Sequence, residues 1–229
     1  MLFVHGAGAS SAIWLGTLHR LARSRRCVAL DLPGHGRSEG AVDSIAAMRD
    51  AVGLTAATLC LGRSVLVGHS MGGLVALAAA LEWPDKVAGL VLVGSAARLG
   101  VGEPFLHVLR DEWARWPAFL AEGAYSPETP AEVRRRGASI ACAASQAQTL
   151  ADFEALRAVD LRPRLAELEV PTLVVHGAHD VMALPKWGRA AAEGIRGART
   201  LELARCGHMP MHEQPEALAE ALRAFVTSA

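Results

Sequence analysis

The stretch "VLVGHSMGGLVALAAA", residues 65–80, places a single serine between two glycines at the point where an apolar run gives way to an alanine-rich segment. The apolar run predicts a buried strand, and the segment from Met71 predicts a helix. Gly68 and Gly72 allow a sharp turn and a close approach of strand and helix. Ser70 therefore fits the G-x-S-x-G pattern of a nucleophile at the carboxyl end of a sheet. A helix N-cap serine is the alternative, but an N-cap does not need glycine on both sides.

The same alternation of short apolar runs and longer helical patterns continues along the chain. Apolar runs without a polar alternation predict strands that are buried on both faces. The expected strands are 1–4, 27–30, 64–68, 87–94, 172–177 and 200–204, and the expected helices are 11–24, 42–62, 71–83, 185–195 and 215–226. This order predicts an α/β fold: a mostly parallel sheet of about six strands or more, with right-handed crossovers and helices on both faces.

Residues 95–165 interrupt the alternation, since they contain helical patterns rich in Ala, Arg and Trp and no convincing strand. They are expected to form a helical cap inserted into the core, which then comprises residues 1–94 and 166–229. The cap is expected to roof a pocket at the end of the sheet.

Composition and charge exclude several classes of partner. Lys+Arg and Asp+Glu both number 23, so the formal charge is zero and neither nucleic acid nor a membrane surface is an expected partner. The first residues show no secretory signal pattern, which favours a cytoplasmic protein. The four cysteines are far apart in the sequence and are expected to be free thiols.

A serine hydroxyl needs a base, and the base needs an acceptor that orients it. Asp180 follows the expected strand 172–177, and His208 follows the expected strand 200–204. Both therefore lie at the same sheet edge as Ser70, in the chain order serine, acid, histidine. Asp31 is the rival acid, but "DLPGHGRS" predicts that it holds a loop through backbone hydrogen bonds.

The remaining histidines are weaker candidates for the base. Structural hydrogen bonds are expected for those that end strands, His5 and His176. His69 is expected to point away from Ser70, while His179 and His212 belong to the acid loop and the last helix.

Two backbone N–H groups are expected to hold a developing oxyanion. One belongs to Met71, directly after the serine, and the other to Ala7 in the glycine-rich turn "HGAGAS", residues 5–10. This turn lacks the G-x-G-x-x-G spacing of a dinucleotide site, and no metal or organic cofactor is expected.

Five motifs together resemble the α/β-hydrolase fold family, in its serine-nucleophile, esterase-like group. They are "HGAG", "DLPGHGRS", "GHSMGG", "VHGAHDVMALP" and "GHMPMHEQPEALAEALRAF", and they span most of the chain outside the cap. The resemblance implies a nucleophile–acid–histidine site. Family members normally have one or two strands before the "HG" strand, whereas this chain begins inside it. One sheet edge is therefore expected to be short or exposed, which favours a homodimer.

The expected function is a serine hydrolase of small carboxylic esters or thioesters that works through an acyl-enzyme. Three alternatives stay open with the same triad: a carbon–carbon bond or enol-lactone hydrolase, a cofactor-free perhydrolase, and a small-molecule receptor. An acidic carrier protein is a further candidate partner, through "VRRRG" at 133–137, although a solvated helix face is the favoured explanation of those arginines. The expected pocket residues are His5, Gly6, Trp113, Trp116 and Phe119.

Overall fold

A computed structural model describes residues 1–23 and 25–228 of the chain. The helix expected over 11–24 ends on Ser24, and the expected core ends on Ala229. Both of these residues lie outside the described part.

Six strands form one parallel sheet, as the apolar runs predict. They are β1 (Leu2–Val4), β2 (Val28–Leu30), β3 (Ser64–His69), β4 (Val87–Val93), β5 (Thr172–Gly177) and β6 (Arg199–Leu203), in the order β2-β1-β3-β4-β5-β6. Every neighbouring pair is parallel. The carboxyl ends of all six strands therefore meet at one edge of the sheet, as the α/β prediction requires.

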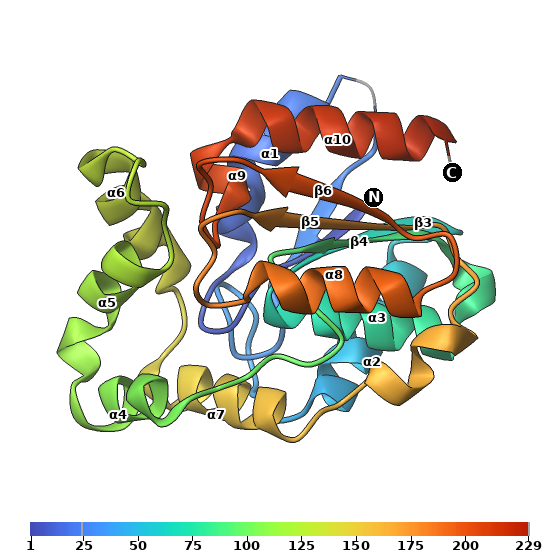
Figure 1. The fold of residues 1–229 in the computed structure, drawn as a ribbon. Helices are drawn as coiled ribbons and strands as arrows, with labels where there is room; N and C mark the ends of the chain where they lie inside the picture. The colour runs from blue at the N-terminus through green and yellow to red at the C-terminus, as the bar shows by residue number, and fades with distance from the viewer. Residues whose placement is uncertain (24, 229) are drawn as a thin grey trace.

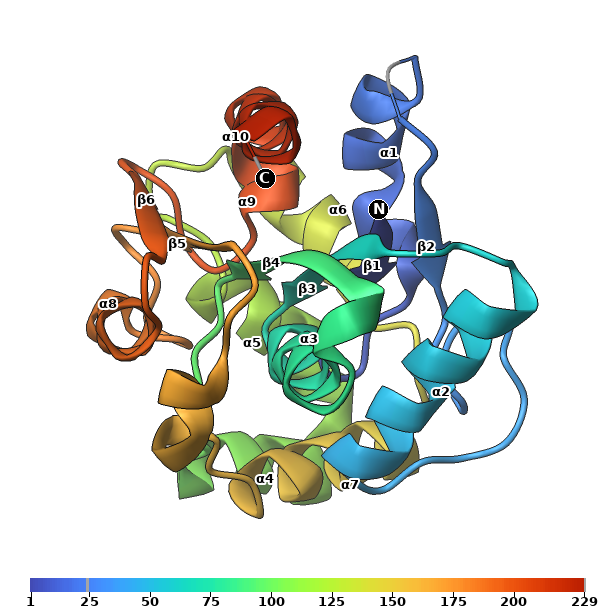
Figure 2. The same ribbon diagram turned by 90° about the vertical axis from the view of Figure 1, so that its right-hand side faces the viewer.

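Helices cover both faces of the sheet (Figure 2). One face carries α1 (Leu15–Leu21), the short α9 (Pro210–Glu213) and α10 (Pro215–Ser228). The other carries α2 (Ile45–Thr58), α3 (Met71–Glu82) and α8 (Pro185–Gly194). The short 3₁₀ helices are η1 (Ser11–Trp14), η2 (Pro84–Lys86), η3 (Trp113–Arg115) and η4 (Arg162–Glu167). Among the described residues, no helix combines the length and apolar character that a membrane crossing needs.

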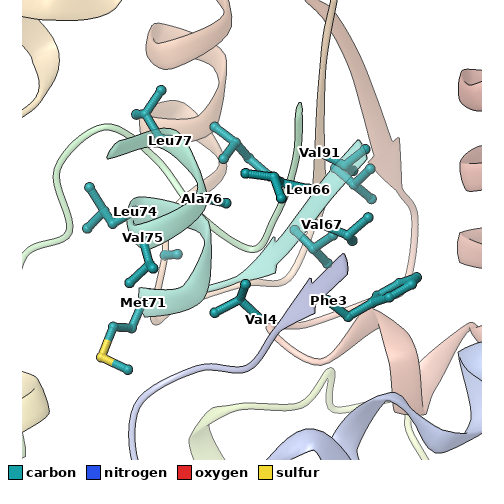
Figure 3. Packing of buried hydrophobic residues seen from close by; sticks show 14 of the residues in the cluster. Phe3, Val4, Leu66, Val67, Met71, Leu74, Val75, Ala76, Leu77 and Val91 are labelled. Carbon is teal, nitrogen blue, oxygen red and sulfur yellow. The ribbon is translucent and has the colours of Figure 1, made fainter. Parts of the chain in front are cut away.

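The core is densest where α3 lies on the central strands. Successive side chains of a strand alternate between the two faces of the sheet. Val4 and Leu66 accordingly face α3, whereas Phe3 and Val67 point away from it (Figure 3). On that second face the Phe3 ring packs against Trp14 of η1, with ring centroids 5.2 Å apart. Side chains buried on both faces fix the sheet, and with it the positions of the loops at its carboxyl edge.

Four helices separate β4 from β5 in the sequence. They are α4 (Glu103–Asp111), α5 (Trp116–Gly123), α6 (Ala131–Ala141) and α7 (Gln146–Arg157). All of residues 95–165 are described and none of them is in a strand. The helices of this α4–α7 segment lie beyond the carboxyl ends of β5 and β6 and along one side of the core (Figure 1, green to yellow). This placement suits a cap, and the division into core and cap remains a prediction.

The strand at one sheet edge, β2, has only three residues. A short edge strand presents few unpaired backbone groups to a second copy of the chain. The homodimer expected from the sequence stays a prediction.

Candidate active site

Ser70 occupies a strained turn between β3 and α3. Its φ is 52° and its ψ is −118°, a region that residues with a side chain rarely adopt. Its N–H donates to Val93 O at 2.9 Å, and the Ser95 hydroxyl donates to its carbonyl at 2.7 Å. These bonds to the end of β4 and the residues after it hold the turn at the carboxyl edge of the sheet.

Two glycines make this turn sterically feasible. A Cβ on Gly68 would collide with the backbone of Gly72, and a Cβ on Gly72 would collide with the carbonyl oxygens of Val4 and His5. The G-x-S-x-G spacing is thus explained by close backbone packing of α3 against β3 and β1.

Asp180 and His208 form a buried pair beside this turn. His208 Nδ1 lies 2.8 Å from Asp180 Oδ2, and the two residues are 4% and 2% exposed. The second carboxylate oxygen accepts the N–H groups of Met182 and Ala183 at 2.9 and 2.8 Å. Since Nδ1 faces a carboxylate, it carries the proton, and Nε2 is left with a lone pair. His208 and Ser70 line the same cavity.

Glu213 fixes the loop that carries His208. Its carboxylate joins the N–H groups on both sides of the histidine to the link between α5 and α6. The contacts are to Gly207 N (2.9 Å), Met209 N (3.1 Å), Ser126 N (2.8 Å) and Thr129 Oγ1 (2.6 Å). His208 N also donates to Ala124 O at 2.8 Å. The α4–α7 segment therefore helps to set the position of the imidazole.

The turn after β1 lines the same cavity with Gly6 and Ala7. Gly6 O accepts from His5 Nδ1 at 2.8 Å and from Ala9 N at 3.2 Å. In a trans peptide the next N–H, that of Ala7, points the opposite way. In the part of the chain that the structure describes, the N–H groups of Ala7 and Met71 have no hydrogen-bond partner. Two donors are thus free, one on the residue after Ser70 and one on a residue that lines the same cavity.

The cavity between the core and the α4–α7 segment has a volume of about 50 Å³. Ala7, Gly6, Ser70 and His208 form its core side. The α4–α7 segment and the residues leading into it supply mostly apolar groups, namely Leu99, Val101, Phe105, Trp116, Leu120, Tyr125, Phe153 and Leu156. An apolar enclosure with a few polar groups at one end suits an acyl group.

Of the five residues expected in the pocket, Gly6 and Trp116 line the cavity, and His5, Trp113 and Phe119 do not. His5 is fully buried behind the turn, where Nε2 accepts the Leu32 N–H at 3.1 Å. Burial lowers the pKa of His5 to about 4, so the ring is neutral. Phe119 stacks on the outer side of Trp116 with centroids 5.7 Å apart, and Trp113 packs at the edge of the core.

His69 lies beside the site, so the expectation that it points away is wrong. It lines the cavity, its Nε2 donates to His208 O at 2.9 Å, and the two rings lie 4.7 Å apart. Burial, and then the charge of a protonated His208, hold the pKa of His69 well below its usual value. A neutral His69 adds no positive charge beneath His208.

The remaining sequence expectations concern residues around the site. Asp31 accepts the N–H groups of Ser11 and Arg37 at 2.7 and 3.0 Å, which confirms its role in a loop. His176 Nε2 contacts Glu202 at 3.1 Å. The four cysteines are free. Burial, followed by the charge of Glu213, raises the pKa of the Cys206 thiol, which makes it a poor nucleophile.

Within the described residues, no group of three or more His, Cys, Asp or Glu side chains is placed to hold a metal ion.

Comparison with known proteins gives the family and the fold. Residues 1–221 match the Alpha/beta hydrolase family. The chain belongs to that family. A pimeloyl-[acyl-carrier protein] methyl ester esterase of Neisseria meningitidis is 29% identical over 245 residues, covering 97% of this α/β-hydrolase and 91% of that protein. A putative carbamate hydrolase of Variovorax paradoxus is 33% identical, covering 91% of this chain and 84% of its own.

Among solved structures, the enol-lactonase from Burkholderia xenovorans superimposes with a TM-score of 0.90 at 28% identity, covering 99% of this chain and 91% of that one. These three relatives share a fold, yet their names state different substrates.

Two side chains that organise the site had no sequence prediction. Glu213 stands in "HEQPE" at the end of the histidine loop, and Asp152 stands in the helical stretch "LADFEALR". Nothing in the local pattern distinguishes Asp152 from a surface acid, although it is completely buried in the fold.

Proposed function

We propose that this α/β-hydrolase is a serine hydrolase that cleaves small carboxylic esters through an acyl-enzyme. The observation that carries the proposal is the buried 2.8 Å contact of Asp180 with His208, in one cavity with the strained Ser70. The proposed catalytic residues are Ser70, Asp180 and His208.

In the acylation step, His208 Nε2 takes the proton of the Ser70 hydroxyl as the oxygen attacks the ester carbonyl. Asp180 accepts the Nδ1–H bond and stabilises the imidazolium. The carbonyl oxygen becomes an oxyanion, which the N–H groups of Met71 and Ala7 bind. His208 then gives its proton to the leaving alkoxide or thiolate, and the alcohol or thiol departs from the acyl-enzyme.

In the second step, water replaces the alcohol. His208 removes a proton from the water as it attacks the acyl carbon, and the same two N–H groups bind the second oxyanion. The serine oxygen leaves with the proton from His208, which releases the carboxylic acid and restores the enzyme.

The cavity volume indicates the size of the acyl group. At about 50 Å³ the cavity is small, and the residues of its wall are mostly apolar. We therefore expect acetyl and butyryl esters to be better substrates than octanoyl esters. The α4–α7 segment supplies most of the apolar wall, so we assign it the role of a cap that sets acyl length.

An ester carried by an acyl carrier protein is the second candidate, because one relative's name states such a substrate. A groove that shares Leu99, Gly100 and Val101 with the cavity is lined by Arg98, Arg157 and Arg162. Acidic side chains pair with all three arginines. A groove with balanced charge favours the small free ester over an acidic carrier protein.

The proposal is tested by steady-state hydrolysis of p-nitrophenyl acetate, butyrate and octanoate by the wild type and by Ser70→Ala. We expect turnover that vanishes in the variant and that falls from butyrate to octanoate. Equal, slow turnover by both proteins would contradict ester hydrolysis. Carbon–carbon, peroxide-dependent and receptor activities would then need separate assays.

A cap variant tests the assigned wall of the cavity. Leu120 is buried in α5 and lines the cavity. Leu120→Ala is expected to raise the octanoate-to-acetate ratio of kcat/KM at least about tenfold, because each added methylene in an apolar pocket is worth about 1–3 kcal/mol. An unchanged ratio in a folded variant would place the acyl group elsewhere.

A further inference from the structure

A buried ion pair joins α7 to the loops that follow β1 and β2. The Asp152 carboxylate and the His35 imidazole are 0% and 1% exposed, and Asp152 Oδ2 lies 2.8 Å from His35 Nε2. The same oxygen accepts the Gly8 N–H at 2.8 Å. The second oxygen, Oδ1, accepts from Gln148 Nε2 at 3.0 Å.

The His35 ring lies between two oxygen atoms. Its Nδ1 lies 3.0 Å from Pro33 O and its Nε2 lies 2.8 Å from Asp152 Oδ2. Burial alone lowers the pKa of His35, but the hydrogen bond and charge of Asp152 outweigh it and hold the pKa above its usual value. Asp152 thus places both of its oxygens in hydrogen bonds inside the protein.

Residues of α7 and of the loop before it hold Gly8 through several contacts. Besides the Asp152 contact, the N–H groups of Ala143 and Ala144 both donate to Gly8 O at 2.9 Å. Gly8 has a φ of +67°, and a Cβ on it would lie 2.8 Å from the Thr149 side chain. Gly8 directly follows Ala7, which lines the cavity. The Ala7 N–H belongs to the preceding Gly6–Ala7 peptide, so fixing the Ala7–Gly8 peptide restrains its direction through the two backbone torsions of Ala7.

We propose that Asp152, supported by His35, is a positioning residue for the oxyanion hole. Through Gly8 it aims the Ala7 N–H at the reacting carbonyl, so the hole is complete only while α7 is docked. This proposal rests on the proposed ester hydrolysis. A structural anchor alone would affect stability, whereas a positioning residue affects binding of the oxyanion more than binding of the ester.

The test compares kcat, KM and inhibition by an aryl trifluoromethyl ketone, which forms a tetrahedral oxyanion adduct with a serine. Asp152→Ala removes the acceptor, and Asp152→Asn keeps one acceptor oxygen. Loss of an oxyanion donor costs about 10²–10³ in kcat. A displaced donor is expected to cost about 10–100-fold in the Ala variant and less in the Asn variant. KM should stay within about threefold, and the inhibition constant should rise by the same factor as kcat falls.

Glu154→Gln is the matched control, since it removes an exposed carboxylate of the same helix that pairs with Arg110. It is expected to leave kcat and the inhibition constant unchanged. Circular dichroism and thermal melting establish that each variant is folded. If the Ala variant fails to fold, the Asn variant carries the comparison.

The outcomes separate the two proposals. Folded Asp152 variants with wild-type kcat and wild-type inhibition, alongside an inactive Ser70→Ala, would overturn the positioning role and leave ester hydrolysis intact. A KM that rises while kcat and inhibition stay unchanged would also overturn it. A wild type as slow as Ser70→Ala on every ester would overturn both proposals.

Discussion

Replacing Glu213 removes the acceptor that holds the histidine loop against the α4–α7 segment. Glu213→Ala loses the contacts to Gly207 N, Met209 N, Ser126 N and Thr129 Oγ1, together with the weaker contact of the Cys206 thiol. Each of the four strong hydrogen bonds is worth at least about 1 kcal/mol, so the free energy of unfolding is expected to fall by at least about 4 kcal/mol. The loop then loses its anchors on both sides of His208, and kcat is expected to fall about 10–100-fold.

Glu213→Gln is the graded comparison. The amide oxygen can still accept from the two N–H groups beside His208, and the amide nitrogen can donate to the Thr129 hydroxyl. Only the Ser126 N–H is left without an acceptor, which costs about 1–3 kcal/mol. The free energy of unfolding is therefore expected to fall by about 2 kcal/mol, with kcat within about threefold of the wild type.

Urea unfolding followed by circular dichroism gives the stabilities, and hydrolysis of p-nitrophenyl butyrate gives kcat. As a control, the kcat values of the two Glu213 variants are compared at a temperature where both variants are fully folded. An Ala variant as stable and as active as the wild type would refute the role assigned to this carboxylate.

Two further predictions follow from packing and from burial. Gly72→Ala is expected to lower the melting temperature and abolish most activity, because the new Cβ would collide with the backbone of β1 and of the residue that follows β1. Gly123→Ala is the control: its Cβ would enter open space, so neither the melting temperature nor the activity should fall. Burial lowers the pKa values of His5 and His212 to about 4, below the value of about 6.5 in the unfolded chain, so their contribution to stability is complete above pH 6.5 and is lost as the pH falls toward 4. As the pH falls from 7 to 5, each of these two histidines should lower the free energy of unfolding by about 2 kcal/mol. His35 has the opposite effect, because its carboxylate partner raises its pKa. A free energy of unfolding that rises as the pH falls from 7 to 5 would contradict the lowered pKa values of His5 and His212.

The residues at strand ends could be predicted from the sequence for a physical reason. Buried parallel strands leave continuous apolar runs, and their carboxyl ends must meet at one edge. That rule alone places the residues after β3, β5 and β6 together. Ser70, Asp180 and His208 stand at those ends, and the structure brings them to one cavity or into contact.

The residues that support the site could not be predicted from the sequence, because their partners are distant in the sequence. Asp152 is 144 residues from Gly8 and 117 from His35, and Glu213 is 87 residues from Ser126. No local pattern records such contacts. The sequence could not distinguish Trp113 from Trp116 for a related reason: which of them faces the cavity depends on where η3 ends and α5 begins.

The covalent intermediate on Ser70 is tested most directly by rapid mixing with p-nitrophenyl butyrate, acid quenching and mass spectrometry of the intact protein and its peptides. We expect one butyryl group per chain, carried by the peptide that contains Ser70 and absent from Ser70→Ala. No acyl adduct during rapid turnover, or the same adduct on Ser70→Ala, would contradict an acyl-enzyme at this serine.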